Sequence, residues 1–160
     1  MRRTSTVRRA RRPGGRALEL SVRGAGVPLP LPVALVRRAV AAAVRAGGRG
    51  RPALAALGVT FLTRPGIQRL NREWLRHDWP TDVVSFPLAR PDGALAGDVY
   101  ICPAVARREA AERGIPAREE LVRLVVHGTL HVLGHDHPGG EARTTSPMWR
   151  LQERLVRSLA

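Results

Sequence analysis

The sequence predicts a single α+β domain in which a small mixed four-stranded sheet is packed by about five helices. Three observations lead to this prediction. The chain has 160 residues, the length of one ordinary domain, and 44% of them are hydrophobic, which is enough for a core. Short runs rich in β-branched residues are interspersed with longer runs of helical periodicity. No internal repeat is present, so we expect one sheet with helices packed around it.

The strands are predicted where short runs are β-branched and aromatic, or alternate between apolar and polar residues. ALELSVR alternates in this way, whereas GVTFLT is β-branched and aromatic. TDVVSF and GDVYIC are separated by a loop rich in Pro and Gly. The predicted strands are residues 17–23, 58–63, 81–86 and 97–102.

The helices are predicted from apolar residues at helical spacing and from the prolines and glycines that bound them. Gly47, Gly114 and Gly134 each follow such a run, and glycine readily adopts the left-handed conformation that ends a helix. The predicted helices are residues 30–48, 65–76, 103–114, 117–134 and 145–160.

Positive charge is concentrated toward the N-terminus. The formal net charge is +14, and the first sixteen residues hold seven arginines and no acidic residue. We therefore predict a basic disordered arm over residues 1–16 and one folded domain over residues 17–160. The arm also resembles a transit peptide, and a start codon assigned too far upstream would explain it equally well.

The composition narrows the classes of function. A strongly basic chain suggests a polyanionic partner such as RNA, although basic residues that are all arginine also fit a GC-rich coding bias. No run of about 18 apolar residues is present, so no membrane-spanning helix is expected. The single cysteine, Cys102, excludes an intrachain disulfide, and its place at the end of a strand predicts a small buried residue.

The stretch HGTLHVLGHDH holds four of the five histidines. His127 and His131 are four residues apart on a predicted helix, so their side chains share one face. A straight helix would carry His135 about 12 Å along the axis from His127, so a third ligand requires the chain to turn back after Gly134. Either His135 or His137 could then complete a metal site, and the spacing favours His137.

This spacing matches the metzincin peptidases, whose three histidines bind zinc and leave one coordination position open. We expect one Zn²⁺ per chain, although imidazole ligands also suit other divalent metals. Metzincins carry Glu directly after the first histidine as general base, but this chain has Gly128 there. A peptidase mechanism of that kind is therefore not expected. We expect His135 at the surface or facing a substrate, and His77 in solvent.

Three stretches together resemble one protein family. HGTLHVLGHDH resembles the histidine signature of the YbeY endoribonucleases, which mature ribosomal RNA in bacteria and also have Gly after the first histidine. LNREWLRHDWPTDVVSFPL, residues 70–88, and GDVYICP, residues 97–103, resemble two further segments of that family. Their order and spacing agree, and the likeness covers residues 17–160.

The resemblance implies a metal-dependent endoribonuclease that prefers single strands. It implies action at the 3′ end of small-subunit ribosomal RNA and in ribosome quality control, in the cytoplasm. The metal ligands that it implies are His127, His131 and His137. RNA and the small ribosomal subunit are the expected partners, and neither DNA nor a membrane is expected.

Two further residues are candidates near the metal. In some members of the family an arginine important for RNA cleavage directly follows the aromatic residue that is Trp74 here, whereas this chain has Leu75 and then Arg76. Arg76 is therefore our candidate for stabilising charge on the reacting phosphate. Asp136 could orient a ligand imidazole or cap the turn after the helix, and the turn is the favoured role.

Two other functions fit parts of the sequence. A metzincin-like metallohydrolase or peptidase would need a general base elsewhere, because position 128 offers none. A non-catalytic ribosome assembly factor would use the metal to hold the end of the helix together. A His131→Ala protein that folds but no longer cleaves RNA would argue against the assembly factor.

Overall fold

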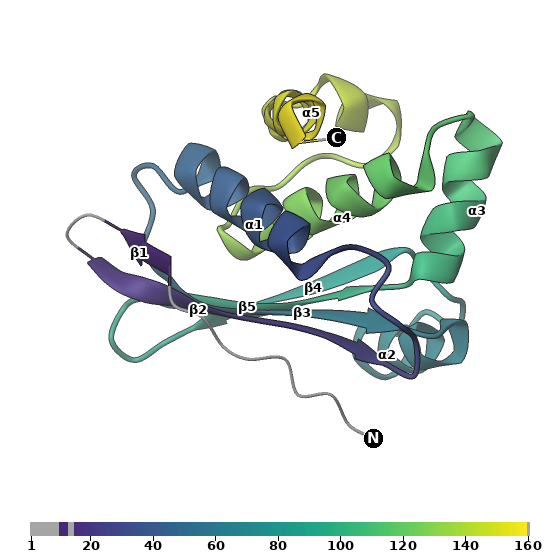
Figure 1. Cartoon of the computed structure of the whole chain (residues 1–160), viewed down its shortest axis with the longest axis horizontal. Coiled ribbons are helices and arrows are strands. Elements are labelled where there is room, and N and C mark those ends of the chain that lie inside the picture. The colour runs from purple at the N-terminus through teal and green to yellow at the C-terminus, as the bar shows by residue number, and fades with distance from the viewer. Residues whose placement is uncertain (1–9, 13–14, 160) are drawn as a thin grey trace.

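One mixed sheet forms the centre of the computed structural model, which describes residues 10–12 and 15–159 (Figure 1). The strand order is β1-β2-β3-β5-β4. β2, β3 and β5 are parallel, while β1 and β4 pair antiparallel at the two edges. The strands are β1 Ala10–Arg12, β2 Gly15–Ala25, β3 Leu54–Leu62, β4 Val83–Ala89 and β5 Leu95–Ile101.

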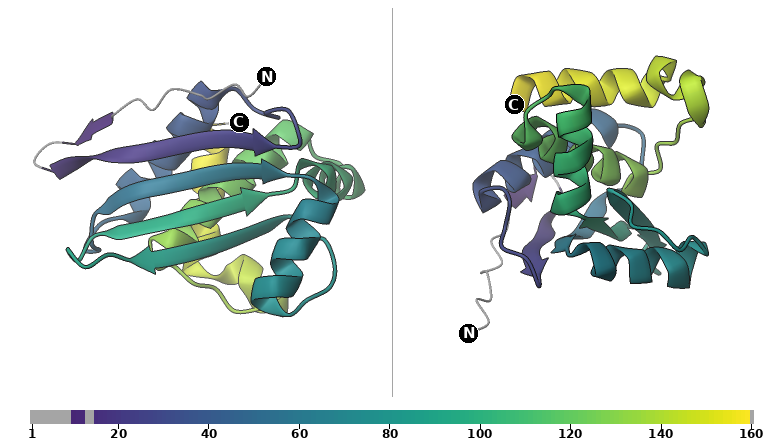
Figure 2. Two further views of the ribbon diagram at one scale, coloured as in Figure 1. Left: turned by 90° about the horizontal axis from the view of Figure 1, so that it is seen from below. Right: turned by 90° about the vertical axis from the view of Figure 1, so that its right-hand side faces the viewer.

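The helices divide unevenly between the two faces of the sheet. α1, Val33–Gly47, and α4, Ala117–Val132, pack on the upper face in Figure 1, and α5, Pro147–Leu159, lies above them. α2, Arg64–Leu75, crosses the opposite face, as the view from below in Figure 2 shows. α3, Pro103–Arg113, stands at the same end of the sheet as α2. The layered core therefore lies on the face of the sheet that α1 and α4 cover.

The core lies between the sheet and the pair α1 and α4. Leu57, Val59 and Phe61 alternate along β3 and are buried against these helices. In α4, every residue from Glu120 to Leu130 is buried. A polar side chain on such a helix must find its partner within the protein, because water does not reach it. The buried polar residues of α4 must therefore have partners within the protein or bind a ligand.

Two glycines let α4 approach the sheet closely. A Cβ atom on Gly128 would lie 2.4 Å from the side chain of Val99 on β5. A Cβ atom on Gly97 of β5 would lie 2.6 Å from Val132 of α4. Both distances are far below van der Waals contact, so a larger residue at either position would push the helix away from the strand.

The predicted fold class is confirmed. The domain is α+β, and β2, β3, β5 and β4 form the predicted mixed four-stranded sheet. The short strand β1 and a 3-10 helix, η1 Gly140–Thr145, are additional to the predicted elements. β3 also begins four residues earlier than predicted, at Leu54 rather than residue 58. Its alanines have a low β-propensity, but pairing with strands on both sides overrides that preference.

The predicted basic arm lies partly outside the described residues, at positions 1–9 and 13–14. Within its described part, Ala10–Arg12 pairs with β2, which itself begins at Gly15, and the disordered arm stays a prediction. Strand pairing uses main-chain groups, and arginine side chains do not prevent it. Among the described helices, none combines the length and apolar character needed to cross a bilayer.

Candidate metal centre

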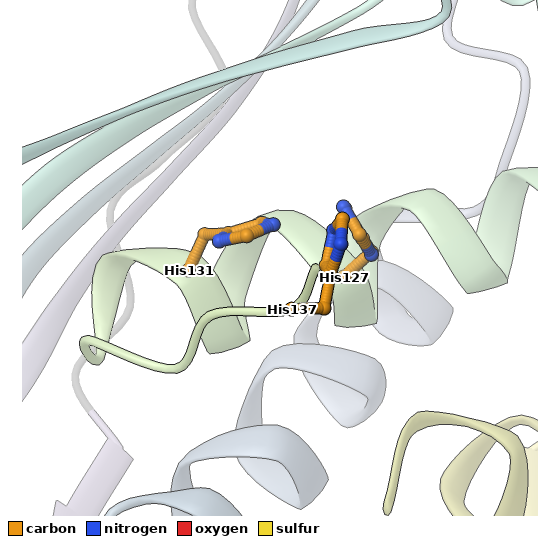
Figure 3. Close-up of side chains that lie close together, drawn as sticks. All are labelled: His127, His131 and His137. Atoms are coloured by element: carbon orange, nitrogen blue, oxygen red, sulfur yellow. The ribbon is translucent and has the colours of Figure 1, made fainter. Parts of the chain in front are cut away.

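Three histidines meet near the C-terminal end of α4 (Figure 3). His127 and His131 lie one turn apart on the helix, and His137 returns to them from the loop that follows. The ring centroid of His127 lies 4.5 Å from that of His131 and 5.2 Å from that of His137, and the last two are 5.0 Å apart. One nitrogen atom from each ring lies within 4.8 Å of the other two. The structure thus brings together the three residues predicted from their spacing.

The turn after α4 determines the position of the third histidine. Gly134 has a φ of +96°, in the region that favours glycine, and the backbone N–H of His135 donates to the carbonyl of Leu130 at 3.0 Å. Asp136 Oδ1 then accepts a hydrogen bond from the backbone N–H of His137 at 2.8 Å. Asp136 therefore caps this turn, which is one of the two roles considered for it.

His127 is oriented by Gln152 of α5, which the sequence analysis did not single out. Gln152 is buried, and its Oε1 lies 2.7 Å from His127 Nδ1. An amide oxygen only accepts hydrogen bonds, so Nδ1 carries the proton and Nε2 keeps a lone pair for a ligand. Glu153 accepts from Gln152 Nε2 at 3.1 Å and fixes the amide. The sequence held one signal for it: Gln152 lies four residues from both Met148 and Val156, so it shares the buried face of α5 with them.

The helical histidines are held in the neutral form that a metal requires. Burial is the main cause that lowers the pKa of His127 to about 4, and the charge of His131 adds to it, while the hydrogen bond with Gln152 acts in the opposite direction. Burial and the charge of His137 likewise lower the pKa of His131. Both imidazoles therefore offer lone pairs at neutral pH with little competition from protons.

The donor set fits a small divalent cation. A tetrahedral centre with ligands at about 2.0–2.1 Å has its donor atoms roughly 3.4 Å apart. The nitrogen atoms of this group, within 4.8 Å of one another, reach that spacing by small rotations of the rings. Three imidazoles leave one position for a water or a substrate, and they do not by themselves select the metal.

A cavity of about 420 Å³ lies beside the histidine group and is lined in part by His127. Part of its lining is acidic, because Asp82, Glu109 and Glu120 have carboxylate oxygens within 4.8 Å of one another. Burial, followed by the charges of Asp82 and Glu120, raises the pKa of Glu109. The volume is within the range of small-molecule binding sites, so the cavity can admit part of a substrate next to the metal position.

A second buried polar cluster lies in the first half of α4. Arg123 is only 8% exposed and donates to Glu119, Glu120 and Glu153, in each case at 2.8 Å. Burial alone would lower the pKa of Arg123, but these hydrogen bonds raise it. Arg113 also forms an ion pair with Glu120. Every charge in this cluster therefore has a partner, including Glu153, which also accepts a hydrogen bond from the Gln152 amide.

Other residues considered from the sequence lie away from the histidine group. Arg76 ends α2 as an exposed C-cap residue with a φ of +58°, and it lies outside the lining of the cavity. His77 is exposed and Cys102 is fully buried, as predicted. The expectation for His135 is wrong, because its ring is half-buried and its Nε2 lies 2.7 Å from the carbonyl oxygen of Gly47. This contact joins the ends of α1 and α4.

Known proteins are similar to this chain in sequence and in fold. Residues 33–160 match the family model described as Endoribonuclease YbeY. A relative of that name from Alkalilimnicola ehrlichii is 41% identical over 140 residues, which cover 84% of this chain and 80% of the relative. One from Chromohalobacter salexigens is 43% identical over 107 residues, which cover 65% of this chain and 68% of the relative. The solution structure of a Thermotoga maritima protein superposes with a TM-score of 0.57 at 25% identity and covers 88% of each chain.

The α+β fold and the neutral histidine group beside a cavity define a candidate metalloprotein. The family model matches most of the chain, and the histidine motif lies within the matched residues. The chain therefore belongs to the YbeY endoribonuclease family, as the resemblance predicted.

Proposed function

We propose that this chain is a metal-dependent endoribonuclease that cleaves single-stranded RNA. Its proposed target is the 3′ end of small-subunit ribosomal RNA, during maturation and quality control of the small ribosomal subunit in the cytoplasm. The observation that carries this proposal is the group of three clustered histidines beside a cavity, in a chain whose relatives are named endoribonucleases.

We assign the metal to His127, His131 and His137, with Zn²⁺ as the proposed ion. A divalent ion held there would supply a Lewis acid that polarises a phosphoryl oxygen and activates a water. Gln152 leaves Nε2 of His127 unprotonated, and burial keeps protons off both helical histidines. Because the three imidazoles are neutral, they leave the positive charge of the ion available to the phosphate.

The shape of the site supports the proposed preference for single strands. His127 borders a concave cavity rather than a flat face, so an RNA segment must bend toward it. A flexible single strand can turn a phosphodiester and an unstacked nucleotide inward, whereas paired and stacked bases resist that distortion. We therefore expect unpaired RNA to reach the metal position more readily than a duplex of the same sequence.

Peptide hydrolysis is less well supported, for a structural reason. The metzincin glutamate would occupy position 128, where even a Cβ atom would lie 2.4 Å from Val99. The packing of α4 on β5 therefore leaves no room for that general base.

The catalytic arginine implied by the resemblance stays a prediction at Arg76. α2 lies across the sheet from α4, so Arg76 would have to act on a substrate strand that extends beyond the cavity. The arginines that line the cavity beside His127 are Arg113, Arg123 and Arg143.

The proposed function is tested with zinc-loaded protein and RNA of one sequence in single-stranded and duplex form, with and without chelator. A folded His131→Ala variant serves as the control. We expect cleavage of the single strand that chelator abolishes, added Zn²⁺ restores and the variant lacks. If folded, zinc-loaded protein cleaves neither free RNA nor RNA in small ribosomal subunits, the nuclease proposal fails and an assembly factor becomes the better account.

A further inference from the structure

Three arginines line the cavity beside the histidines, and they differ in how they are paired. Arg113 forms an ion pair with Glu120, and Arg123 donates to three carboxylates. Arg143 forms no side-chain hydrogen bond or ion pair with any described residue, and its Nε atom is buried without a partner. A guanidinium group left without an acceptor in a partly buried place can still bind a ligand, whereas the other two are already occupied.

The position of Arg143 is nevertheless well defined. Its backbone carbonyl accepts hydrogen bonds from the N–H of Ser146 at 3.2 Å and from the Ser146 hydroxyl at 2.7 Å. Its Cζ atom lies 5.5 Å from the ring centroid of Trp149, so the indole holds the guanidinium by a cation–π contact. This contact supplies no oxygen acceptor, so the guanidinium N–H groups still lack one and can bind an anion.

Arg143 also lies close enough to the histidines to act on them. It lines the same cavity as His127. After burial and the charge of a neighbouring histidine, its positive charge is among the causes that lower the pKa of both His127 and His131. A ligand held by Arg143 would therefore sit within reach of the metal position.

The charges around the cavity indicate which ligand group goes where. Asp82, Glu109 and Glu112 contribute negative charge to the lining, so an anion is repelled from that part. The unpaired guanidinium of Arg143 is the complementary place for a phosphate, which guanidinium groups bind through two parallel N–H···O hydrogen bonds.

We propose that Arg143 binds a phosphate of the RNA strand at the histidine site. This inference rests on the proposed function, because it takes RNA as the substrate. The phosphate lies between the guanidinium edge and the metal position, and Trp149 holds the guanidinium in place. When the phosphodiester is attacked, the same group stabilises the additional negative charge on its oxygens. This role does not depend on Arg76.

Binding is measured in a His131→Ala background with chelator present, so that no cleavage occurs, using a short single-stranded RNA at several salt concentrations. The variants Arg143→Ala and Arg143→Lys are compared with Arg150→Ala, which removes an exposed arginine of α5 outside the cavity lining. We expect Arg143→Ala to weaken binding at least about tenfold more than Arg150→Ala and to lower the salt slope by about 0.7. Arg143→Lys keeps the charge without the planar fork and should recover only part of the loss.

Cleavage is then measured with the histidines intact. Arg143→Ala should lower kcat/KM by roughly a hundredfold, while Arg150→Ala stays near the unmutated value. Thermal unfolding checks the fold of each variant, and Arg143→Gln, which retains a stem to pack on Trp149, replaces Arg143→Ala if that protein is unstable.

The outcomes separate this inference from the function on which it rests. If the unmutated protein cleaves RNA but the Arg143 variants match Arg150→Ala in binding and cleavage, the phosphate site is wrong and the proposed function stands. If the unmutated protein neither binds nor cleaves RNA, both fail.

Discussion

Helix α4 contributes to two polar clusters, each at least partly buried, that differ in how their polar groups are satisfied. In its first half, Arg123 lies among three carboxylates, and each charge has an oppositely charged partner. In its second half, His127 and His131 face His137, and among the described residues no carboxylate hydrogen-bonds to any of the three rings. The charges of the first cluster are all paired within the protein, whereas the histidine rings of the second cluster direct nitrogen lone pairs toward one another.

The paired cluster therefore has a structural role, whereas the histidine cluster can bind a ligand. A cluster whose charges are all paired holds elements together but has no capacity left to bind a ligand. Neutral imidazoles that face one another lack that mutual satisfaction, and a cation placed among them would provide it. Glu153 and Gln152 connect the two clusters, so the orientation of His127 depends on the paired cluster.

The largest expected effect comes from removing one histidine of the unsatisfied cluster. His137→Ala should abolish tight metal binding and lower kcat/KM for RNA roughly a thousandfold or more, because the ion loses a third of its protein ligands. His137 lies in a loop and is half-buried, so the metal-free protein should keep its stability.

The matched control is His135→Ala, two residues away. This change removes the contact with the carbonyl of Gly47 and should cost about 1 kcal/mol of unfolding free energy, with metal binding and cleavage retained. Metal content, RNA cleavage and urea unfolding distinguish the two variants, and equal loss of cleavage in both would contradict the assignment.

Arg123→Met tests the paired cluster. Glu119, Glu120 and Glu153 would lose their common partner inside the protein, and the free energy of unfolding should fall by about 3–5 kcal/mol. Urea unfolding of the metal-free protein measures the change. Arg118→Met, at an exposed position of the same helix, is the control, and equal stability of the two variants would show that the cluster does not stabilise the fold.

Acid should destabilise the metal-free protein through the histidines. The pKa of His127 is about 4 in the folded protein and about 6.5 when unfolded, so between these values the unfolded chain binds more protons. The contribution is fully present above pH 6.5 and is lost as the pH falls toward 4, by an amount on the order of 3 kcal/mol. Urea unfolding across this range measures it, and a His127→Asn protein with an equally steep pH dependence would contradict this origin.

Gln152→Leu should have the smallest effect of the four. The variant keeps all three ligands but loses the acceptor that fixes the tautomer of His127, so zinc affinity should fall by about tenfold to a hundredfold. Competition with a colorimetric chelator measures the affinity. Gln152→Glu retains an acceptor oxygen and should bind zinc more tightly than Gln152→Leu, whereas identical affinities in the two would remove Gln152 from the site.

Local spacing made the histidine group predictable. His127 and His131 share a helix face by periodicity alone, and Gly134 marks the turn that makes His137 a candidate. The fold class was predictable for the same reason, because runs of period two and of helical period alternate along the chain.

The residues that support the site were not predictable, because long-range packing places them. Gln152 reaches His127 only when α5 packs on α4, and the two residues are 25 positions apart in the sequence. Arg143 lies in the 3-10 helix η1, which has no apolar pattern of its own. The contact of His135 with Gly47 joins residues 88 positions apart, which no local pattern indicates.

The most direct test of the contrast within α4 is a calorimetric titration of metal-free protein with Zn²⁺. The unmutated chain, His131→Ala and Arg123→Met are measured side by side at neutral pH. The Arg123→Met protein is first shown to be folded under these conditions. The account predicts one tightly bound ion per chain in the unmutated and Arg123→Met proteins, and none in His131→Ala. Absence of binding in the unmutated chain, or unchanged binding in His131→Ala, would contradict it.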